Sequence, residues 1–552
     1  MVEFKLSRRS TLRTGMLGGA ALGLNSSQAQ SQITLTPFMD PLPVPPIAQP
    51  VAPFETKADV PTTNPDRSTA YHLSGPRKVA DNTVYYHVEQ KQAYHKFHSQ
   101  LPATSIWGYE GILPGPTLIT QSGIPALVRF ANHLPENDPI GIGEPITAIH
   151  HHGGFQAPED DGYPLDTFAH GQTRDYYYPN APELGLSENE LSTLWYHDHS
   201  IDVTAVNAFR GLFGFSMNFD ALDSLAGEDD PYPAAFRLPG MMVGAKRLYD
   251  VPLMIADRSF DANGQFVYNS FDHDGFIGDP RLSVNGKIQP YFDVERRKYR
   301  FRLLNCSNAR MMELFLVVNG KATPIHYVIG TDVSLFEKPL ANVPSLRMAS
   351  AERFDIILDF SRFAPGAEVY IENRMLQING RKPEGLTSTG PRIIKFKVSS
   401  STTLPTDNSS VPTVLRTVTE GPAYLLSKVK IERTFEFGRS NGAWTINNEF
   451  FDENRVIAKP RLGVPEIWTF KSGGGWSHPI HVHLANFFVL SRDGKTPPLL
   501  ERGRKDTVRI GWKEKDVKVL VQFNGYTGRY AFHCHNMEHE DVRMMGNIEL
   551  QP

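Results

Sequence analysis

Cysteine, net charge and long hydrophobic runs are all scarce in this sequence. Its 552 residues carry a formal net charge of −4, and the isoelectric point is near 6.6. A charge balance this close to neutral gives no electrostatic reason to expect a nucleic acid or an anionic membrane surface as a partner. The apolar stretch at residues 16–24 is too short to span a bilayer. We therefore expect no nucleic-acid partner and no membrane span.

The chain has only two cysteines, which could form at most one disulfide bond. Cys534 lies between two histidines in a spacing typical of metal ligands, and Cys306 ends a strand-like stretch that begins at Tyr299. A buried free thiol is the usual state of a cysteine in such a strand. We therefore predict that the two cysteines are not paired.

The first 29 residues resemble a signal peptide for export. Arg8 and Arg9 precede the apolar stretch, and the small residues around Ala29 are typical of a cleavage site. A basic tail without a targeting role is the alternative. The twin-arginine route carries folded proteins, so this pattern predicts export to the bacterial periplasm or the extracellular space.

The composition is that of a globular protein long enough for about three domains. Hydrophobic residues make up 40% of the chain and charged residues 21%. Short alternating strands with Gly, Pro and Asn turns dominate. Prolines crowd between residues 37 and 61, which predicts an extended arm that is draped or loose. A stretch rich in Ser and Thr from residue 399 predicts a linker.

Two motifs occur twice, which indicates a duplicated structural unit. The triplet at residues 150–152 matches residues 481–483, and residues 193–199 match residues 529–535 at nearly the same displacement along the chain. Each copy therefore carries two His-x-His pairs.

A middle copy without metal ligands is indicated by related fragments at residues 284–287 and 446–449. Three strand-rich copies in sequence predict an all-β protein of three sequential Greek-key β-sandwich domains. The predicted segments are the signal peptide (1–29), a Pro-rich arm (30–65), domain 1 (66–225), domain 2 (226–398), a linker (399–424) and domain 3 (425–552).

The four His-x-His pairs predict a metal cluster. Residues two apart on a strand point to the same face, so both rings of each pair reach one side, and four strands can bring their pairs together. Imidazole suits copper and leaves coordination positions open for O2. The eight predicted cluster ligands are His150, His152, His197, His199, His481, His483, His533 and His535.

Within this cluster, His150 and His481 are predicted to bind one type 2 copper, and the other six histidines to bind two type 3 coppers. A thiolate with two imidazoles and a thioether is the ligand set of a blue, type 1 copper site. Met545 is the rival for the thioether position. The predicted total is four copper ions, and the type 1 ligands are His478, Cys534, His539 and Met544.

Simpler explanations exist for parts of this pattern. One His-x-His pair alone is more often a pair of packed histidines than a metal site, but four pairs with repeat symmetry are not explained in this way. Structural zinc requires four closed ligands and does not account for twelve ligands in two groups. His151 points away from its neighbours by strand alternation and is expected to be a packed or hydrogen-bonded histidine.

At these motifs the chain resembles the multicopper oxidases, and no ligand of the family pattern is missing. Residues 474–481 and 533–536 look most like the bilirubin oxidases, and the bacterial spore-coat laccases are also similar. The likeness extends over most of the mature chain through residues 114–116, 175–180, 297–302 and 351–355.

The resemblance implies cupredoxin-like domains and a copper-dependent oxidoreductase. Four one-electron oxidations of an organic reductant would be coupled to the reduction of O2 to two water molecules. The reductant would be a phenol, an aromatic amine or a bilirubin-like tetrapyrrole. Electrons would enter at His539 and pass along Cys534 to His533 and His535. The expected partners are a small-molecule reductant and O2, and we expect a monomer.

The resemblance also implies carboxylates beside the cluster, because four protons accompany the four electrons. Asp161 and Glu540 match positions with this role in similar enzymes, and Trp476 resembles the tryptophan beside the type 1 site of bilirubin oxidases. Asp198 is expected to face away from the cluster. Asp161, Glu540 and Trp476 could each instead be an ordinary turn or core residue. The fallback carboxylates are Glu159 and Asp160.

Three other functions compete with this one. A metallo-oxidase that uses Cu(I), Fe(II) or Mn(II) as the reductant would require a soft or acidic docking patch. Methionine is sparse, at 14 residues, and the pairs Met241-Met242 and Met311-Met312 are expected in the core. A copper-free scaffold and a two-domain nitrite reductase are disfavoured by the complete ligand set and the third repeat.

Overall fold

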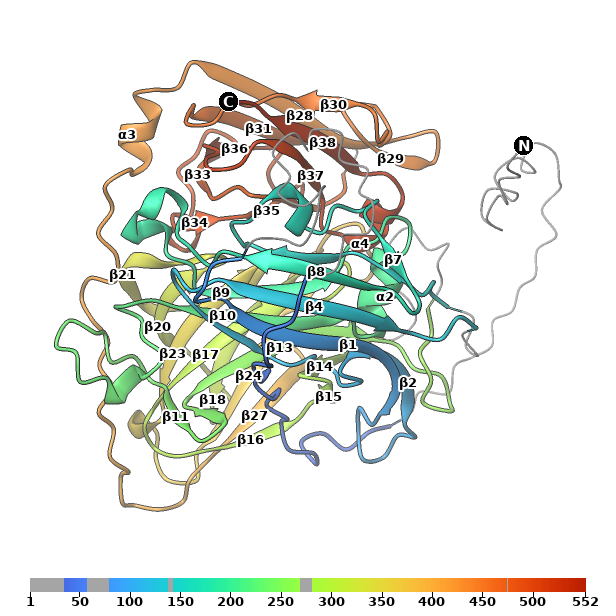
Figure 1. Cartoon of the computed structure of the whole chain (residues 1–552). Helices are drawn as coiled ribbons and strands as arrows, with labels where there is room; N and C mark the ends of the chain where they lie inside the picture. Colours follow the sequence, from blue (N-terminus) through green and yellow to red (C-terminus); the bar gives the residue numbers. More distant parts are fainter. Residues whose placement is uncertain (1–33, 57–78, 138–141, 269–279, 474) are drawn as a thin grey trace. The chain divides into compact units, whose positions relative to one another are not determined.

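Short β-strands make up most of the regular structure in the computed structural model of the chain (Figure 1). The predicted signal peptide lies outside the described residues. Residues 35–552 form one unit by their contacts. Within the described ranges, no helix combines the length and apolar character that a membrane crossing needs. The structure describes residues 34–56, 79–137, 142–268, 280–473 and 475–552.

The first group of strands, blue to teal in Figure 1, forms two four-stranded sheets. Tyr109, Phe130 and Tyr196 come from both sheets, and their ring centroids lie 4.8 to 5.8 Å apart in the core. One sheet contains β2 (Thr104–Tyr109), β1 (Val84–His95), β4 (Ala126–His133) and β8 (Thr173–Tyr178). The other contains β3 (Leu118–Gln121), β10 (Phe213–Phe219), β9 (Thr193–Asp198) and β6 (Ile149–His152).

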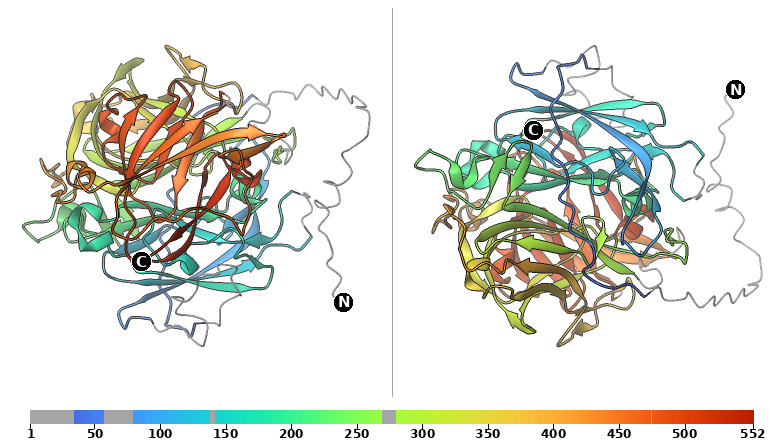
Figure 2. Two further views of the ribbon diagram at one scale, coloured as in Figure 1. Left: turned by 90° about the horizontal axis from the view of Figure 1, so that it is seen from above. Right: turned by 90° about the horizontal axis from the view of Figure 1, so that it is seen from below.

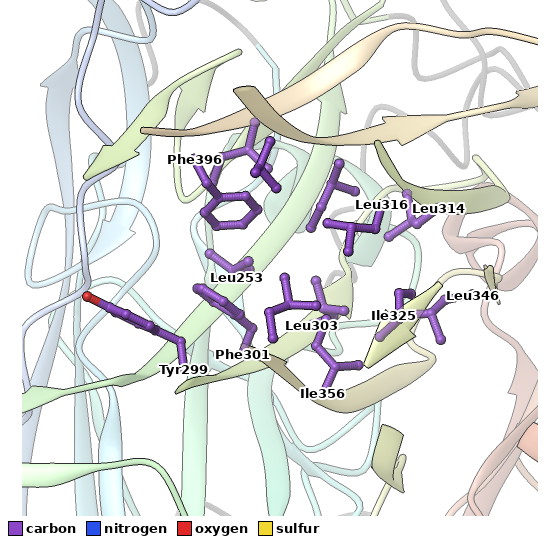
Figure 3. Close-up of a cluster of buried hydrophobic side chains, with 14 of the residues drawn as sticks. Leu253, Tyr299, Phe301, Leu303, Leu314, Leu316, Ile325, Leu346, Ile356 and Phe396 are labelled. Carbon is purple, nitrogen blue, oxygen red and sulfur yellow. The ribbon is translucent and has the colours of Figure 1, made fainter. Parts of the chain in front are cut away.

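The second group, green to yellow, forms a seven-stranded and a six-stranded sheet (Figure 1). Figure 3 shows their apolar faces meeting, with Leu303 and Ile356 from one sheet and Leu316 and Phe396 from the other. The larger sheet contains β15 (Lys287–Ile288), β14 (Arg281–Val284), β13 (Asp250–Arg258), β17 (Lys298–Asn305), β23 (Arg353–Asp359), β20 (Ile325–Thr331) and β21 (Ser334–Val343). The smaller contains β16 (Tyr291–Val294), β27 (Arg392–Val398), β24 (Glu368–Asn373), β18 (Met312–Val318), β19 (Lys321–Thr323) and β22 (Leu346–Met348).

The third group, orange to red, forms a six-stranded and a five-stranded sheet, which Figure 2 shows from two further directions. Phe435 of one sheet packs against Phe532 of the other, with ring centroids 5.0 Å apart. One sheet contains β29 (Ala443–Ile446), β28 (Ile431–Ser440), β31 (Glu466–Ser472), β36 (Asp516–Val521), β33 (Phe487–Arg492) and β34 (Arg504–Lys505). The other contains β30 (Val456–Ala458), β38 (Met545–Leu550), β37 (Gly528–Cys534), β32 (His478–Val482) and β35 (Thr507–Ile510).

The three groups repeat one pairing pattern. In the first, β1 pairs antiparallel with β2 and parallel with β4, which pairs antiparallel with β8. The strands β14-β13-β17-β23 and β29-β28-β31-β36 follow the same sequence of pairings. This repetition confirms the predicted all-β fold of three sequential β-sandwich units, which we call the first, second and third unit. The predicted segment boundaries stay predictions.

The fragments that indicated the middle copy form tight turns. Asn285 and Gly286 connect β14 with β15, and both have positive φ angles, 48° and 79°. Asn447 and Asn448 follow β29 with φ angles of 54° and 63°. Asn and Gly favour this left-handed region, which suits a two-residue turn.

Residues 34–56 of the Pro-rich arm are draped over the first two units. The backbone N–H of Leu42 donates to Tyr291 O at 2.7 Å, and that of Val51 donates to Tyr85 O at 2.8 Å. The Leu42 side chain is buried in the core of the second unit. Backbone pairing and apolar burial therefore hold this part of the arm in place.

The predicted linker has no strand between residues 399 and 421 and is also attached to the second unit. The backbone N–H of Lys298 donates to the Asp407 carboxylate at 3.0 Å, and its ammonium donates to the same oxygen at 2.9 Å. Helix α3 (Pro422–Leu426) follows before the third unit begins.

Candidate metal centre

Strand register brings the predicted histidines into facing pairs. In the first unit, β6 runs antiparallel to β9 and places His150 opposite His197. In the third unit, β32 runs antiparallel to β37 and places His481 opposite His533. Because alternate residues share a face of a strand, the second histidine of each His-x-His follows the first to the same side.

The eight histidines predicted for the cluster come together between the first and third units, and all are buried. Nε2 of His150 lies 3.3 Å from Nε2 of His481, and Nε2 of His533 lies 3.1 Å from that of His199 and 3.2 Å from that of His483. Three groups have nitrogens within 4.8 Å of one another, close enough to hold an ion: His150, His481 and His483; His152, His197 and His535; His199, His483 and His533.

The outer ring nitrogens are fixed by oxygen atoms. Nδ1 of His150 lies 2.6 Å from the carbonyl of Asp161, and Nδ1 of His483 lies 2.5 Å from the carboxylate of the same residue. Nδ1 of His481 lies 2.9 Å from the carbonyl of Asp506. Because a carbonyl oxygen can only accept, the proton lies on Nδ1 of His150 and of His481, and Nε2 of each is a lone-pair donor directed into the cluster.

Electrostatics keep the cluster neutral without metal. Burial lowers the pKa of His197 and of His481 to about 3 and that of His199 to about 4. Neighbouring imidazoles add to the effect, because two cations at this distance repel each other. A neutral imidazole is the form that binds a metal ion, so the site is prepared for one at neutral pH.

Both carboxylates predicted for proton delivery border the cluster, as expected. Glu540 lies 3.0 Å from Nδ1 of His533 and 3.5 Å from Nδ1 of His199. Burial raises the pKa of Asp161 well above its ordinary value. Burial would also raise that of Glu540, but His533 and His199 lower it to about 2. The two acids therefore favour opposite protonation states.

A second group of donors lies within the third unit. Nδ1 of His478 and Nδ1 of His539 are 3.1 Å apart, and the Cys534 sulfur lies 3.5 and 3.6 Å from them. A point equidistant from the three atoms lies roughly 2.0 Å from each, which is close to transition-metal bond lengths. The thiol is buried, and burial raises its pKa well above the ordinary value. A bound cation would stabilise the thiolate.

Met544 and Met545 belong to different buried clusters. Met544 shares the core of the third unit with Cys534, whereas Met545 packs with Phe451 and Ala531. Met544 therefore shares a core with the sulfur-containing group and Met545 does not, while the axial ligand stays a prediction.

His539 is positioned by a short helix, α4 (Met537–Asp541), that is attached to the first unit. Asn536 caps α4 through the backbone N–H of His539. Asp541 at its end accepts hydrogen bonds from the backbone N–H groups of Thr204 and Ala205 at 3.0 and 2.9 Å, at the start of α2 (Thr204–Arg210). The helix thus ties the sulfur-containing group to the first unit.

Trp476 lies beside this second group, as predicted, with its ring centroid 5.6 Å from that of His539. Trp444 was missed, although its ring lies closer, at 3.8 Å from His539 and 4.6 Å from Trp476. It belongs to β29, which carries none of the metal-ligand motifs, so the sequence carries no signal that places it beside His539. Trp476 also lines a pocket of about 570 Å³ that includes Glu436 and Arg439.

Asp506 is a second residue that sequence reasoning missed. Its carboxylate lies 3.3 Å from Nε2 of His152 and accepts two hydrogen bonds from Arg353, both 2.7 Å long. Burial would raise the pKa of Asp506, but Arg353 lowers it, so this carboxylate is charged. Arg353 belongs to the family-like stretch 351–355, which had no assigned role.

The expectations for His151, for Asp198 and for the two cysteines agree with the structure. His151 turns away from the cluster, stacks on Tyr178 at 4.2 Å and hydrogen-bonds to Ser216. Asp198 also faces away and accepts hydrogen bonds from Ser200 and Asn207. Both cysteines are free and buried. The fallback carboxylates are also buried, in the turn η2 (Pro158–Asp160).

Comparisons with known proteins agree with this geometry. One profile of the multicopper oxidase family matches residues 87–217 and another matches residues 425–552. A bilirubin oxidase from Albifimbria verrucaria is 34% identical over 517 residues, covering 92% of this chain and 80% of that protein. A laccase from Bacillus stratosphericus is 30% identical over 94% of this chain and 100% of its own length. The solved McoA multicopper oxidase of Aquifex aeolicus has a TM-score of 0.69 and 25% identity, covering 85% of this chain and 96% of that one.

Proposed function

The chain belongs to the multicopper oxidase family, and we propose that it is a four-copper oxidase of the laccase and bilirubin oxidase type. It couples one-electron oxidations of an organic reductant to the reduction of O2 to water. One observation carries the proposal. The Cys534 thiol lies within 3.6 Å of two buried histidines, while its neighbours in the chain, His533 and His535, lie in the histidine cluster.

The donor set supports copper in both places. We assign one type 1 ion to the sulfur-containing group, one type 2 ion to His150 and His481, and two type 3 ions to the remaining histidines of the cluster. When bound, copper supplies the one-electron redox chemistry and the reduction of O2. Cys534 is joined to His533 and His535 through the backbone, so a continuous covalent path links the two groups. The type 1 ligands in this assignment are His478, Cys534, His539 and Met544.

The surroundings of His539 favour an aromatic reductant. Trp476 offers its ring to the pocket beside the sulfur-containing group, and the Arg439 guanidinium lies 5.9 Å from that ring. A single indole among polar side chains offers a stacking surface together with hydrogen-bonding groups, which an aromatic ring with polar substituents can use. We propose that phenols, aromatic amines or bilirubin-like tetrapyrroles bind there.

We place the proton-transferring groups at Asp161 and Glu540. Asp161, with its raised pKa, holds a proton over a wider pH range, whereas ionised Glu540 accepts one beside His533. Acid and base with opposed protonation states are suited to proton transfer.

A metal ion as the reductant is less well supported. Met311 and Met312 are buried in the core, as expected. The expectation was wrong for Met241 and Met242, which are half-buried in the hairpin of β11 (Met241–Val243) and β12 (Lys246–Leu248). Two half-buried methionines in a hairpin do not make a methionine-rich lid. These two methionine pairs therefore do not supply the soft form of the docking patch.

The protein is proposed to be exported by the twin-arginine route and to act as a monomer in the periplasm or outside the cell. The arginine pair, the apolar stretch and the small residues near Ala29 support export. Cell fractionation of the wild type and of an Arg8→Lys, Arg9→Lys variant tests it, and equal export of both would contradict the route.

The variant Cys534→Ser tests the main proposal. We expect copper-loaded Cys534→Ser to lose the intense blue absorption and turnover of a phenol or bilirubin, because the type 1 site loses its thiolate. Circular dichroism should stay unchanged. The matched control is Cys306→Ser, which alters the other buried thiol and should keep both colour and turnover. A blue, active Cys534→Ser protein would contradict the proposal.

A further inference from the structure

The second unit places an arginine beside the histidine cluster. Among the described residues, none of the donor groups that are close enough to hold an ion includes a residue of this unit. Arg353 opens β23 and is completely buried. Its Nη1 and Nη2 donate to the two carboxylate oxygens of Asp506, each at 2.7 Å. Its Nε donates to the carbonyl of Thr193 at 3.2 Å, the first residue of β9. One guanidinium thus contacts all three units.

Asp506, in turn, contacts one predicted ligand from each copper-binding unit. Its carbonyl lies 2.9 Å from Nδ1 of His481, and its carboxylate lies 3.3 Å from Nε2 of His152. These two imidazoles stack with ring centroids 3.8 Å apart. Within the described part of the chain, Nδ1 of His152 has no hydrogen-bond partner. The carboxylate of Asp506 therefore holds Nε2 and leaves Nδ1 as the nitrogen that can bind a metal ion.

The backbone leaves room for the ion pair. Gly153, directly after His152, has a φ angle of 84°. A side chain there would come within 2.7 Å of Nη2 of Arg353 and 2.8 Å of Oδ2 of Asp506. The end of β6 therefore rests against the ion pair, so a shift of the pair would move the strand end that carries His152.

The paired arginine also occupies both oxygens of a carboxylate that could bind metal. His152, His481 and Asp506 form a further group with donor atoms within 4.8 Å of one another. Two parallel N–H···O bonds fix a carboxylate more firmly than a point charge does. Without the two guanidinium N–H donors, a buried, charged carboxylate would lie beside two imidazoles. Together these groups would form a metal-ligand set of mixed oxygen and nitrogen donors.

We propose that Arg353 is a positioning residue for the copper cluster: it holds Asp506 so that the carboxylate orients His152 and stays out of the coordination sphere. The proposal rests on the proposed four-copper function. It makes the ligand-free second unit a determinant of the type 2 and type 3 sites.

Arg353→Lys tests this role, because lysine keeps the positive charge and loses the two parallel N–H donors of the guanidinium. In copper-loaded protein, we expect the blue type 1 absorption to remain. The type 2 electron paramagnetic resonance signal should change toward a mixed nitrogen and oxygen ligand set. Cluster copper should be retained about 10- to 100-fold more weakly in titration with a chelator, as for other partners of metal ligands.

Arg300→Lys is the matched control. Arg300 is also buried in the second unit, and it donates to both oxygens of Asp223 at 2.7 and 2.8 Å. That carboxylate belongs to no metal-sized group among the described residues. Arg300→Lys should lower the unfolding temperature without altering the type 2 signal.

Asp506→Asn keeps the inference testable if Arg353→Lys does not fold. We expect it to weaken retention of cluster copper without producing an oxygen-ligand signal, because the competing carboxylate is gone. An unchanged type 2 signal and unchanged retention in a folded Arg353→Lys or Asp506→Asn protein would overturn the role. Equal changes in Arg300→Lys would also overturn it. A wild type that takes up no copper would instead refute the proposed function.

Discussion

The two groups of donors differ in how much of the fold is needed to form them. The sulfur-containing group lies between residues 478 and 544, within the third unit. The histidine cluster is built on strands from the first and third units and borders the Arg353–Asp506 pair, which joins the second and third units. The sulfur-containing group is therefore local to one sandwich, whereas the histidine cluster forms only where two units meet.

Removing one ligand from each group should separate them most clearly. His478→Ala should abolish the blue absorption and keep the type 2 resonance signal, and His150→Ala should do the reverse. In both, turnover should fall by at least about a thousandfold, the scale expected for an essential group. Optical and resonance spectra of the same samples check this. If either variant lost both signals, the two groups would not be independent.

Asp161→Asn should affect only the cluster side. The hydrogen bond to His483 can persist, but the acid is lost, so we expect reoxidation by O2 to slow about 100-fold. Reduction of the blue site by substrate should stay within about twofold. Stopped-flow measurement of the two half-reactions decides the matter, and equal slowing of both would make Asp161 a structural residue.

Acid should destabilise the copper-free protein mainly through the cluster. The folded-state pKa values of His197, His199 and His481 are about 3 to 4, below the ordinary value of 6.5. The neutral imidazoles contribute their full share of folded-state stability above pH 6.5. This share is lost as pH falls toward 4, because the histidines of the unfolded chain take up protons first. Each group contributes about 3 kcal/mol over this window. Unfolding temperatures between pH 7 and 4 measure it, and a flat profile would contradict these shifts.

The smallest effect is expected at the entrance to the sulfur-containing group. Trp476→Phe keeps an aromatic ring but loses part of the contact with Trp444, which lies 4.6 Å away. We expect KM for an aromatic reductant to rise up to about tenfold, in line with about 0.5 to 1.5 kcal/mol for an aromatic pair. O2 reoxidation should not change. Phe437→Leu, another aromatic change near His478, is the control and should lower stability without raising KM.

Most of the candidate donors were predictable because local chain geometry brings them together. Alternation along a strand explains why His150 and His152 share a face and why His151 does not. The spacing from Cys534 to His539 corresponds to a strand end followed by one helical turn. Such short-range relations survive in a linear pattern.

Other parts of the site were not predictable. Trp444, Asp506 and Arg353 approach the donors only because separate strands and units pack together. No period or spacing links residue 353 to residue 506, and either charge alone resembles an ordinary surface residue in the sequence. Burial of the pair becomes visible only when all three units are in place.

The sequence by itself determined the repeated all-β units and the types of donor, because strand alternation and turn chemistry act over a few residues. The tertiary structure alone decided that His483 belongs to two of the metal-sized groups, which carboxylate stays paired, and which tryptophan touches His539. The physical reason is that these choices depend on distances of a few ångströms between residues hundreds of positions apart. Only the packing of one sandwich against another sets those distances.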